Sequence, residues 1–274
     1  MLREDLRDPE LSGNKARKLH YNLIEAHRRG IRTLVSMGGP YSNHLHALAL
    51  AGRRLGFATV GVVRGLLTGP PLSPTLADCV AAGMSLHPMN RMAFRALRAD
   101  PGPFLATFGE PVYWLPEGGS NALAVRGVAE CLNNDAVRDF APEVVLTAAG
   151  TGATMAGLAA GLARNRRYGE IWAVAVLKGG GFLLSDAKRL LASTGISTRA
   201  PLRVLTGFHF GGYGRRPDAL QQFCPQFFAL TSVPVEPVYT GRVCYALRKL
   251  AAHGAFRQGS RVLLVHTGGL QGAR

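Results

Sequence analysis

Twice along the 274-residue chain, an apolar run typical of a buried strand leads through a glycine-rich turn into a helix. The first copy consists of the run Thr33–Ser36, the turn Met37–Asn43 and a helix from His44 to Leu55; the second copy begins at Glu143–Ala148. Strands that alternate with helices pair in parallel through right-handed crossovers. The pattern therefore predicts an α/β fold with parallel sheets. It also places both turns at the carboxyl ends of strands, where such sheets bind ligands.

The second turn has the composition of an anion-binding site. Gly150, Thr151, Gly152, Ala153 and Thr154 lie between the strand and an alanine-rich helix. Small side chains let an anion approach the main-chain N–H groups, and the helix start adds the positive end of its dipole. The turn lacks the final Gly-Lys-Ser/Thr of a nucleotide P-loop, and its third glycine comes too late for the dinucleotide fingerprint. We expect a phosphate cup here, and an NAD(P)-dependent enzyme is the disfavoured alternative.

Lysine is scarce in this chain, so its positions are informative. Lysine and arginine together number 32, and only five are lysines, which leaves 27 arginines. Two of the five, Lys15 and Lys18, fall in the segment Gly13–Leu19. A group that must lose its proton and attack a carbonyl has to be lysine, because arginine stays protonated in proteins. Lys15 is therefore a candidate for covalent amine chemistry, and Lys178, directly after another apolar strand, is a less favoured rival.

Other candidate side chains lie in turns along the chain. Ser42 and Asn43 precede a helix, where such residues ordinarily serve as caps. Tyr213 stands between two glycines, which on the simplest interpretation is a surface turn. Tyr239 follows a Pro-Val pair, and Thr267 follows the last apolar strand. Each motif alone is weak evidence for a site.

In this order, the motifs resemble those of the D-cysteine desulfhydrase and 1-aminocyclopropane-1-carboxylate (ACC) deaminase family. The resemblance implies a pyridoxal 5′-phosphate (PLP) enzyme of fold type II, the tryptophan-synthase-β-like α/β fold. It would have two three-layer α/β/α domains with mostly parallel sheets, and the cofactor would lie between them. The matching segments, which span nearly the whole chain, are Gly13–Leu19, Gly38–His44, Gly150–Thr154, Gly211–Gly214, Glu236–Arg242 and His266–Gly269.

The resemblance also implies a role for individual residues. Lys15 would hold PLP as a Schiff base, Asn43 would bind its 3′-oxygen, and Thr267 would meet its pyridine nitrogen. Tyr239 would act as an acid or nucleophile near the substrate. The implied catalytic residues are Lys15, Ser42, Tyr213 and Tyr239; the cofactor ligands are Lys15, Asn43, Gly150, Thr151, Gly152, Ala153, Thr154 and Thr267; and the ligands of a small amino-acid substrate are Ser42, Asn43 and His44. No metal is implied.

Three positions bear on the substrate. In the family, ACC deaminases carry glutamate after the active tyrosine and leucine in the last His-x-Gly-Gly, whereas D-cysteine desulfhydrases carry small hydroxyl residues. Here these positions are Thr240 and Thr267. The resemblance therefore implies α,β-elimination on a substrate such as D-cysteine, giving pyruvate, ammonia and sulfide, with ACC deamination as the alternative. Tyr41 stands where relatives usually carry glutamine, which leaves open a protein that keeps the cofactor for binding only.

The resemblance divides the chain into a smaller α/β domain, residues 16–121, and a larger PLP-binding domain, residues 1–15 and 122–274. It also implies a homodimer. We expect a cytoplasmic protein, because no apolar run reaches the length of a membrane span and the first residues lack the apolar core of a signal peptide.

The charge and the cysteines exclude two other classes of function. The formal net charge is +15, but the arginines are dispersed in isolated pairs, and no nucleic-acid module surrounds them. We therefore expect a solvated basic surface and no nucleic-acid partner. The four cysteines, Cys79, Cys131, Cys224 and Cys244, are too widely spaced for a zinc site or a redox pair.

Overall fold

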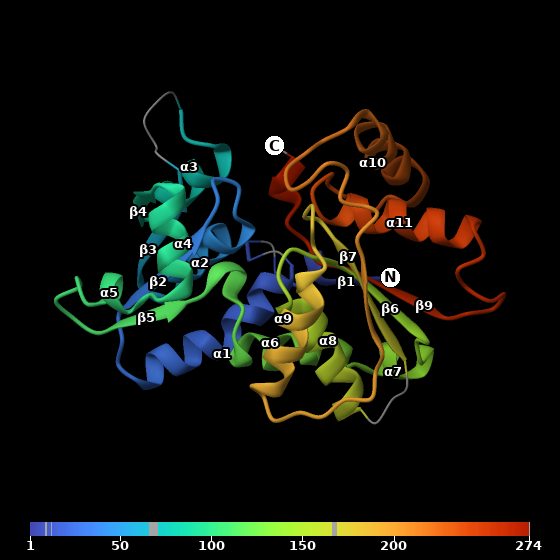
Figure 1. The fold of residues 1–274 in the computed structure, drawn as a ribbon, viewed down its shortest axis with the longest axis horizontal. Coiled ribbons are helices and arrows are strands. Elements are labelled where there is room, and N and C mark those ends of the chain that lie inside the picture. Colours follow the sequence, from blue (N-terminus) through green and yellow to red (C-terminus); the bar gives the residue numbers. More distant parts are fainter. Residues whose placement is uncertain (9, 12, 66–70, 166–168, 274) are drawn as a thin grey trace.

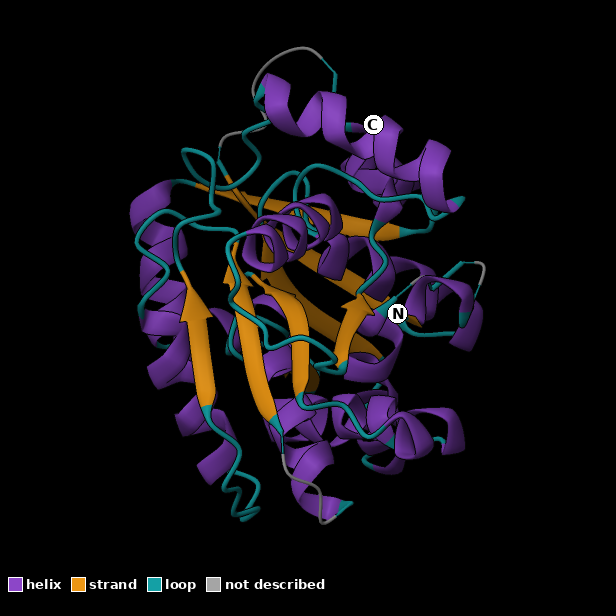
Figure 2. Ribbon diagram, turned by 90° about the vertical axis from the view of Figure 1, so that its right-hand side faces the viewer, coloured by secondary structure: helices purple, strands orange, loops and turns teal. Residues whose placement is uncertain are grey.

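The computed structural model describes residues 1–273 except residues 9, 12, 66–70 and 166–168. Its strands form two sheets, and every pairing between named strands in them is parallel. Figure 1 shows the two halves of the molecule on the left and right, and Figure 2 shows strands enclosed by helices. The predicted fold, two three-layer α/β/α units with parallel sheets, is confirmed.

The smaller sheet is buried on both faces. Its strands, in order, are β4 (Met84–Met89), β3 (Ala58–Arg64), β2 (Thr33–Gly38) and β5 (Val112–Leu115). One face packs against α1 (Asn14–Arg28), α2 (Asn43–Leu55) and α3 (Pro74–Ala81), and the other against α4 (Arg91–Ala99) and α5 (Gly102–Leu105). All six residues of β2 are buried, since β2 lies in the middle of this sheet. That is why its sequence is apolar rather than alternating.

The larger sheet is built in the same way. Its strands, in order, are β1 (Leu2–Arg3), β9 (Val262–His266), β6 (Val144–Ala149), β7 (Glu170–Ala175) and β8 (Leu202–Leu205). One face packs against α6 (Ala122–Ala129), α7 (Asp135–Phe140), α8 (Ala153–Arg164) and α9 (Phe182–Ala192), and the other against α10 (Asp218–Thr231) and α11 (Thr240–Ala252). Short 3-10 turns are η1 (Glu4–Leu6), η2 (Glu117–Gly119), η3 (Glu130–Leu132) and η4 (Leu270–Ala273).

Helix α1 joins the two halves. Its residues Leu19 and Ala26 belong to the core of the smaller sheet. Its other side packs closely on α6 of the larger half, where a side chain at Gly127 would overlap the carbonyl group of Arg17. All four strands of the smaller sheet lie within residues 16–121, and the strands of the larger sheet lie outside that range. Because α1 packs on both halves, the domain boundaries themselves remain a prediction.

Candidate active site

A pocket lies where the starts of α1 and α2 meet the segment before α11 and the loop after β9. Its lining residues are Asn14, Lys15, Asn43, Tyr239, Thr267, Gly268 and Gly269. Four predicted site residues, Lys15, Asn43, Tyr239 and Thr267, are thus brought together from opposite ends of the sequence. A wider cavity of about 400 Å³ lies beside α11, but none of the predicted site residues lines it. The residues that line the smaller pocket therefore make it the candidate active site.

Lys15 is the second residue of α1, and the backbone before it is held by the loop after β9. Gly13 has φ of 83°, and a side chain there would overlap the carbonyl oxygen of Thr267. The Asn14 N–H donates to that same oxygen at 3.1 Å. The Lys15 ammonium donates to the Asn14 side-chain oxygen at 3.1 Å. Burial lowers the pKa of Lys15 to about 8, which brings its neutral, nucleophilic form near physiological pH.

The predicted phosphate cup, residues Gly150–Thr154, lies between β6 and α8. Gly152 precedes the helix and has no side chain that could cap it. The first N–H groups of α8 are therefore available to a ligand. A Cβ at Gly152 would lie 2.6 Å from the main-chain nitrogen of Ala187, which explains the need for glycine. Asn14 links the cup to Lys15, because its side-chain amide donates to the Thr154 hydroxyl at 2.9 Å.

Lys18 is a second lysine at this site, and the sequence prediction missed its role. Its side chain is only 1% exposed. Its ammonium lies 3.2 Å from the carbonyl oxygen of Gly118 and 3.4 Å from the hydroxyl of Thr151 in the phosphate cup. Burial and the nearby charge of Lys15 lower its pKa well below the ordinary value. The available signal was its spacing, because residues three apart share one face of a helix.

Ser42 and Asn43 lie at the start of α2. The Ser42 hydroxyl accepts the N–H of Leu45 at 3.2 Å, so the ordinary capping role is confirmed. Asn43 is buried and lines the pocket. Ser42 is half-buried, and the Tyr41 side chain before it is exposed. The start of α2 therefore brings one pocket-lining amide and one capping hydroxyl to the site.

His44 is buried one residue further on, and its hydrogen bonds fix its tautomer. The Ser36 hydroxyl donates to the carbonyl oxygen of Leu115 at 2.8 Å, so the Ser36 oxygen accepts from His44 Nε2 at 3.0 Å. His44 Nδ1 then carries a lone pair, and this atom is buried without a hydrogen-bond partner among the described residues. Burial and the charges of Lys15 and Lys18 lower the pKa of His44 well below the ordinary value. A neutral imidazole thus offers an acceptor in a buried place.

The two predicted tyrosines are in contact. The Tyr239 hydroxyl donates to the Tyr213 hydroxyl at 3.3 Å. The Tyr213 hydroxyl in turn donates to the carbonyl oxygen of Tyr41, 3.4 Å away in the smaller half. Burial raises the pKa of Tyr213, and burial together with Tyr213 raises that of Tyr239 well above the ordinary value. Both phenols are therefore protonated and can act as hydrogen-bond donors.

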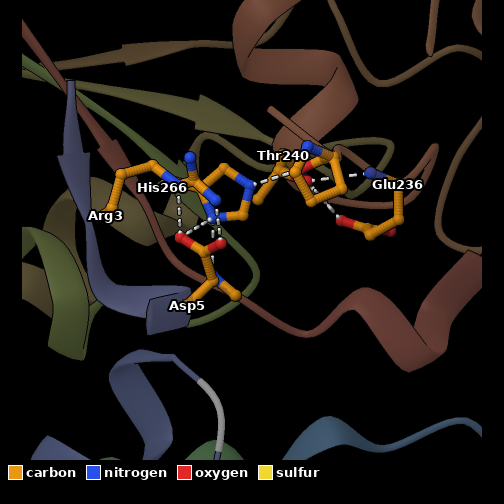
Figure 3. Close-up of polar contacts among 7 residues, drawn as sticks. Arg3, Asp5, Glu236, Thr240 and His266 are labelled. Carbon is orange, nitrogen blue, oxygen red and sulfur yellow. Dashed lines mark hydrogen bonds and ion pairs between the residues drawn. The ribbon is translucent and has the colours of Figure 1, made fainter. Parts of the chain in front are cut away.

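Thr267 follows β9, and the residue before it, His266, belongs to a polar network with Asp5 and Arg3 (Figure 3). Asp5 accepts two hydrogen bonds from Arg3, at 2.8 and 2.6 Å, and its carboxylate lies 3.0 Å from His266 Nδ1. His266 Nε2 donates to the Pro234 carbonyl at 2.7 Å. Burial by itself would raise the pKa of Asp5, but Arg3 and His266 outweigh it and lower the pKa. This network could not be predicted from local sequence, because the parallel pairing of β1 with β9 creates it.

A buried carboxylate positions Tyr239. Glu236 accepts the main-chain N–H groups of Val238, Tyr239 and Thr240, each at 2.7 Å. The Thr240 hydroxyl also donates to Glu236 at 3.2 Å and accepts the Glu236 N–H at 3.0 Å. Figure 3 shows Thr240 turned toward Glu236. The Thr240 hydroxyl is therefore engaged with its own turn.

Comparison with known proteins identifies the family. A profile described as "Pyridoxal-phosphate dependent enzyme" matches residues 2–268. The chain belongs to this PLP-dependent enzyme family. A relative from Pyrococcus abyssi, whose name assigns it provisionally to ACC deaminase, is 29% identical over 98% of this chain and 84% of its own length. The D-cysteine desulfhydrase of Serratia proteamaculans is 29% identical over 97% of this chain and 85% of its own length. The crystal structure of an ACC deaminase homologue superposes with a TM-score of 0.83, at 25% identity, covering 98% of this chain and 84% of that chain.

The site of this PLP-dependent enzyme fits its cofactor. The cup offers small residues and a helix start to a phosphate, and the buried Lys18 ammonium hydrogen-bonds to two neutral oxygens there, so an anion would compensate its charge. Lys15 supplies an amine of lowered pKa in the pocket. Lys178, the rival lysine, is exposed and outside the pocket lining. These observations favour Lys15 as the residue that binds the aldehyde.

Two features are absent from the described part of the chain. No group of three or more His, Cys, Asp or Glu side chains there could hold a metal ion. Within the same residues, no helix is both long and apolar enough to cross a bilayer. Cys79, Cys131, Cys224 and Cys244 are free thiols, and all four are buried.

Proposed function

We propose that this chain is a PLP-dependent lyase of the D-cysteine desulfhydrase type, which converts a small D-amino acid into a keto acid, ammonia and the β-leaving group. D-Cysteine and one water molecule would give pyruvate, ammonia and sulfide. The observation that carries the proposal is the placement of Lys15, whose amine lies in a pocket with Asn43, Tyr239 and Thr267. The names of the relatives support both this activity and ACC deamination.

In this proposal the phosphate cup and Lys18 hold the phosphate of PLP, Asn43 holds its 3′-oxygen, and the Thr267 hydroxyl meets its ring nitrogen. When bound, PLP withdraws electrons from the substrate α-carbon and so makes its proton acidic. A hydroxyl does not force the ring nitrogen to carry a proton, as a carboxylate would. The His266–Asp5–Arg3 network holds the segment that carries Thr267.

Lys15 and Tyr239 are assigned to the α-proton and to the leaving group. Lys15 has a pKa of about 8, so its neutral amine is far more abundant near neutral pH than in an ordinary lysine and can accept the α-proton. Tyr239 stays protonated, so its hydroxyl can donate a hydrogen bond that stabilises a leaving thiolate. Ser42, the start of α2 and His44 are assigned to the substrate, with the helix start favouring its carboxylate.

The surroundings of Thr240 favour D-cysteine over ACC. Glutamate occupies this position in the ACC deaminases that the sequence resembles. In this chain the residue at 240 packs against the buried Glu236 carboxylate, so a second carboxylate would meet a like charge. ACC deamination, and a role in cofactor binding alone, are the alternatives that the assay below separates.

We also propose that the enzyme is a cytoplasmic homodimer that does not bind nucleic acid. This proposal is supported by the family resemblance and by the dispersed arginines. Light scattering of the purified protein would test the oligomeric state, and a monomer at working concentration would contradict the homodimer.

The test is a spectral and product assay on purified protein. The wild type and Lys178→Ala, at an exposed lysine, should bind PLP with visible absorbance and release pyruvate from D-cysteine. Lys15→Ala should lose both signals. A wild type that binds no PLP would overturn the enzyme proposal. Turnover of ACC without turnover of D-cysteine would establish the first alternative, and PLP binding without turnover of any amino acid would establish the second.

A further inference from the structure

Arg242, in the first turn of α11, is fully buried, with 0% of its side chain exposed. A guanidinium group has five N–H donors and no hydrogen-bond acceptor. All five are used, and every acceptor is a main-chain carbonyl oxygen. The acceptors are Pro237 at 3.1 Å, Val176 at 2.8 Å, His209 at 2.7 Å, Gly212 at 3.0 Å and Arg215 at 2.7 Å. No N–H group is left for a carboxylate.

Three of these acceptors belong to the segment 206–217, which connects β8 to α10 without a helix or strand of its own. His209, Gly212 and Arg215 are spaced three residues apart, and their carbonyl groups converge on one cation. The segment is also unusual in its backbone, because Phe210, Gly211, Gly212 and Gly214 all have positive φ. Glycine adopts positive φ readily, but at Phe210 this conformation is strained and persists only when its surroundings impose it. The guanidinium supplies that constraint.

The same segment carries Tyr213, whose hydroxyl contacts Tyr239 and the carbonyl oxygen of Tyr41. Arg242 itself donates to the residue just before Tyr213 and to the residue two positions after it. We propose that Arg242 is a positioning residue, which winds segment 206–217 around its guanidinium and thereby places the Tyr213 hydroxyl against Tyr239. This inference rests on the proposed function for its catalytic consequence, but its structural part does not.

Arginine is required at this position because of its shape. A lysine would bring the same charge with three N–H groups on a single nitrogen, whereas the five acceptors surround three separate nitrogen atoms. Arg242→Lys should therefore release part of the segment while keeping the charge. Arg248→Lys is the matched control, since Arg248 lies on the same helix and is exposed.

Trypsin provides a direct probe, because the exposed Arg215 lies in the segment and the next bond, Arg216–Pro217, resists the protease. Cleavage of the PLP-loaded enzyme after Arg215 should be on the order of tenfold faster in Arg242→Lys, since lost hydrogen bonds to a charged donor favour local opening. Arg248→Lys should match the wild type. An Arg242→Lys enzyme that resists cleavage as the wild type does would overturn the proposal.

Arg242→Gln is the second variant, in case the lysine variant folds poorly. A single cut after Arg215 in either variant supports a local role, and digestion throughout the chain in both would show that Arg242 stabilises the whole fold instead, which overturns the proposal. The trypsin experiment does not depend on turnover. If the proposed function is wrong, the experiment still shows whether Arg242 holds the segment.

The catalytic arm is a double-mutant cycle with Tyr213→Phe. Arg242→Lys should lower kcat on the order of 100-fold with little change in KM, as a misplaced catalytic group does. If Arg242 acts through Tyr213, the double variant should be no slower than the slower single variant. Effects that multiply in the double variant would contradict the assignment of Arg242 as a positioning residue for Tyr213.

Discussion

The two glycine-rich turns at the ends of β2 and β6 begin their helices in different ways. At α2 the Ser42 hydroxyl caps the helix by accepting the Leu45 N–H. At α8 the residue in the same position is Gly152, which has no side chain to offer. A buried ammonium, Lys18, lies beside the second turn. The comparison teaches that one turn is closed by the protein itself, whereas the other is left without a side-chain cap beside a cation, as the proposed phosphate site requires.

The largest effect is expected from a methyl group in the uncapped turn. In Gly152→Ala the new Cβ would lie 2.6 Å from the main chain at Ala187, so the turn must shift. We expect the free energy of unfolding to fall by about 1–3 kcal/mol. PLP affinity should fall roughly 100-fold, the equivalent of about one lost hydrogen bond to a charged group. Thermal unfolding and a PLP titration measure the two effects.

Gly39→Ala is the matched control in the other turn, where a Cβ would come no closer than 3.8 Å to the flexible end of Arg64. It should leave PLP affinity unchanged. Equal losses of affinity in the two variants would contradict the distinction between the turns.

Lys18→Met tests the cation beside the phosphate cup. PLP affinity should fall by about 10- to 100-fold, since a charge-assisted hydrogen bond is lost. The cofactor-free protein should be as stable as the wild type or more stable, because a buried charge is replaced by an apolar side chain. Lys188→Met, at an exposed lysine of α9, should change neither quantity. A large loss of stability without loss of PLP affinity would assign Lys18 to the fold alone.

Ser42→Ala should have a smaller effect, confined to the capped turn. Removal of a helix cap costs about 1 kcal/mol of the free energy of unfolding. PLP affinity should stay the same, while KM for D-cysteine rises, because Ser42 is assigned to the substrate. Steady-state kinetics and denaturant unfolding check this prediction, and a variant that no longer binds PLP would show that the two turns share one ligand.

The pH dependence of stability tests the burial of Lys15. The pKa of Lys15 is about 8 in the folded chain, whereas an ordinary lysine, as in the unfolded chain, has a pKa of 10.5. Between these two pH values the unfolded chain therefore holds a proton that the folded chain has lost. The contribution of Lys15 to the free energy of unfolding of the cofactor-free protein should therefore rise as the pH increases through this range. The four buried thiols, whose pKa values burial raises, contribute in the opposite direction, so the contribution of Lys15 is measured against a variant. The difference in free energy of unfolding between the wild type and Lys15→Met should grow with pH, whereas the difference between the wild type and Lys178→Met should stay constant. Denaturant titrations below and above pH 8 would measure both differences, and a Lys15→Met difference that does not change with pH would contradict the burial of the amine.

Local pattern was sufficient to predict the framework of the fold. The expected strand Thr33–Ser36 extends over Thr33–Gly38, and the helix expected from His44 to Leu55 begins one residue earlier. In both cases the apolar pattern and the flanking glycines are local signals. Helix α10 was not predicted, because Pro225 interrupts its interior and hides the pattern.

The candidate site was predictable where a motif marks a turn, as at Lys15, Asn43 and Thr267, which line one pocket. It was not predictable where tertiary packing creates the contact. Lys18 reaches the phosphate cup only because α1 packs beside α6, and Asp5 meets His266 only through the register of β1 with β9. Arg242 likewise gathers carbonyl groups from distant parts of the chain. Apart from the three-residue spacing between Lys15 and Lys18, such contacts leave no local trace in a sequence.

The most direct measurement is to reduce the PLP-loaded enzyme with borohydride and map the lysine that carries the cofactor by peptide mass spectrometry. Lys15 should carry the pyridoxyl group in one equivalent per chain, while Lys18 and Lys178 should be unmodified. Labelling of Lys18 or Lys178, or no labelling of any lysine, would contradict the account.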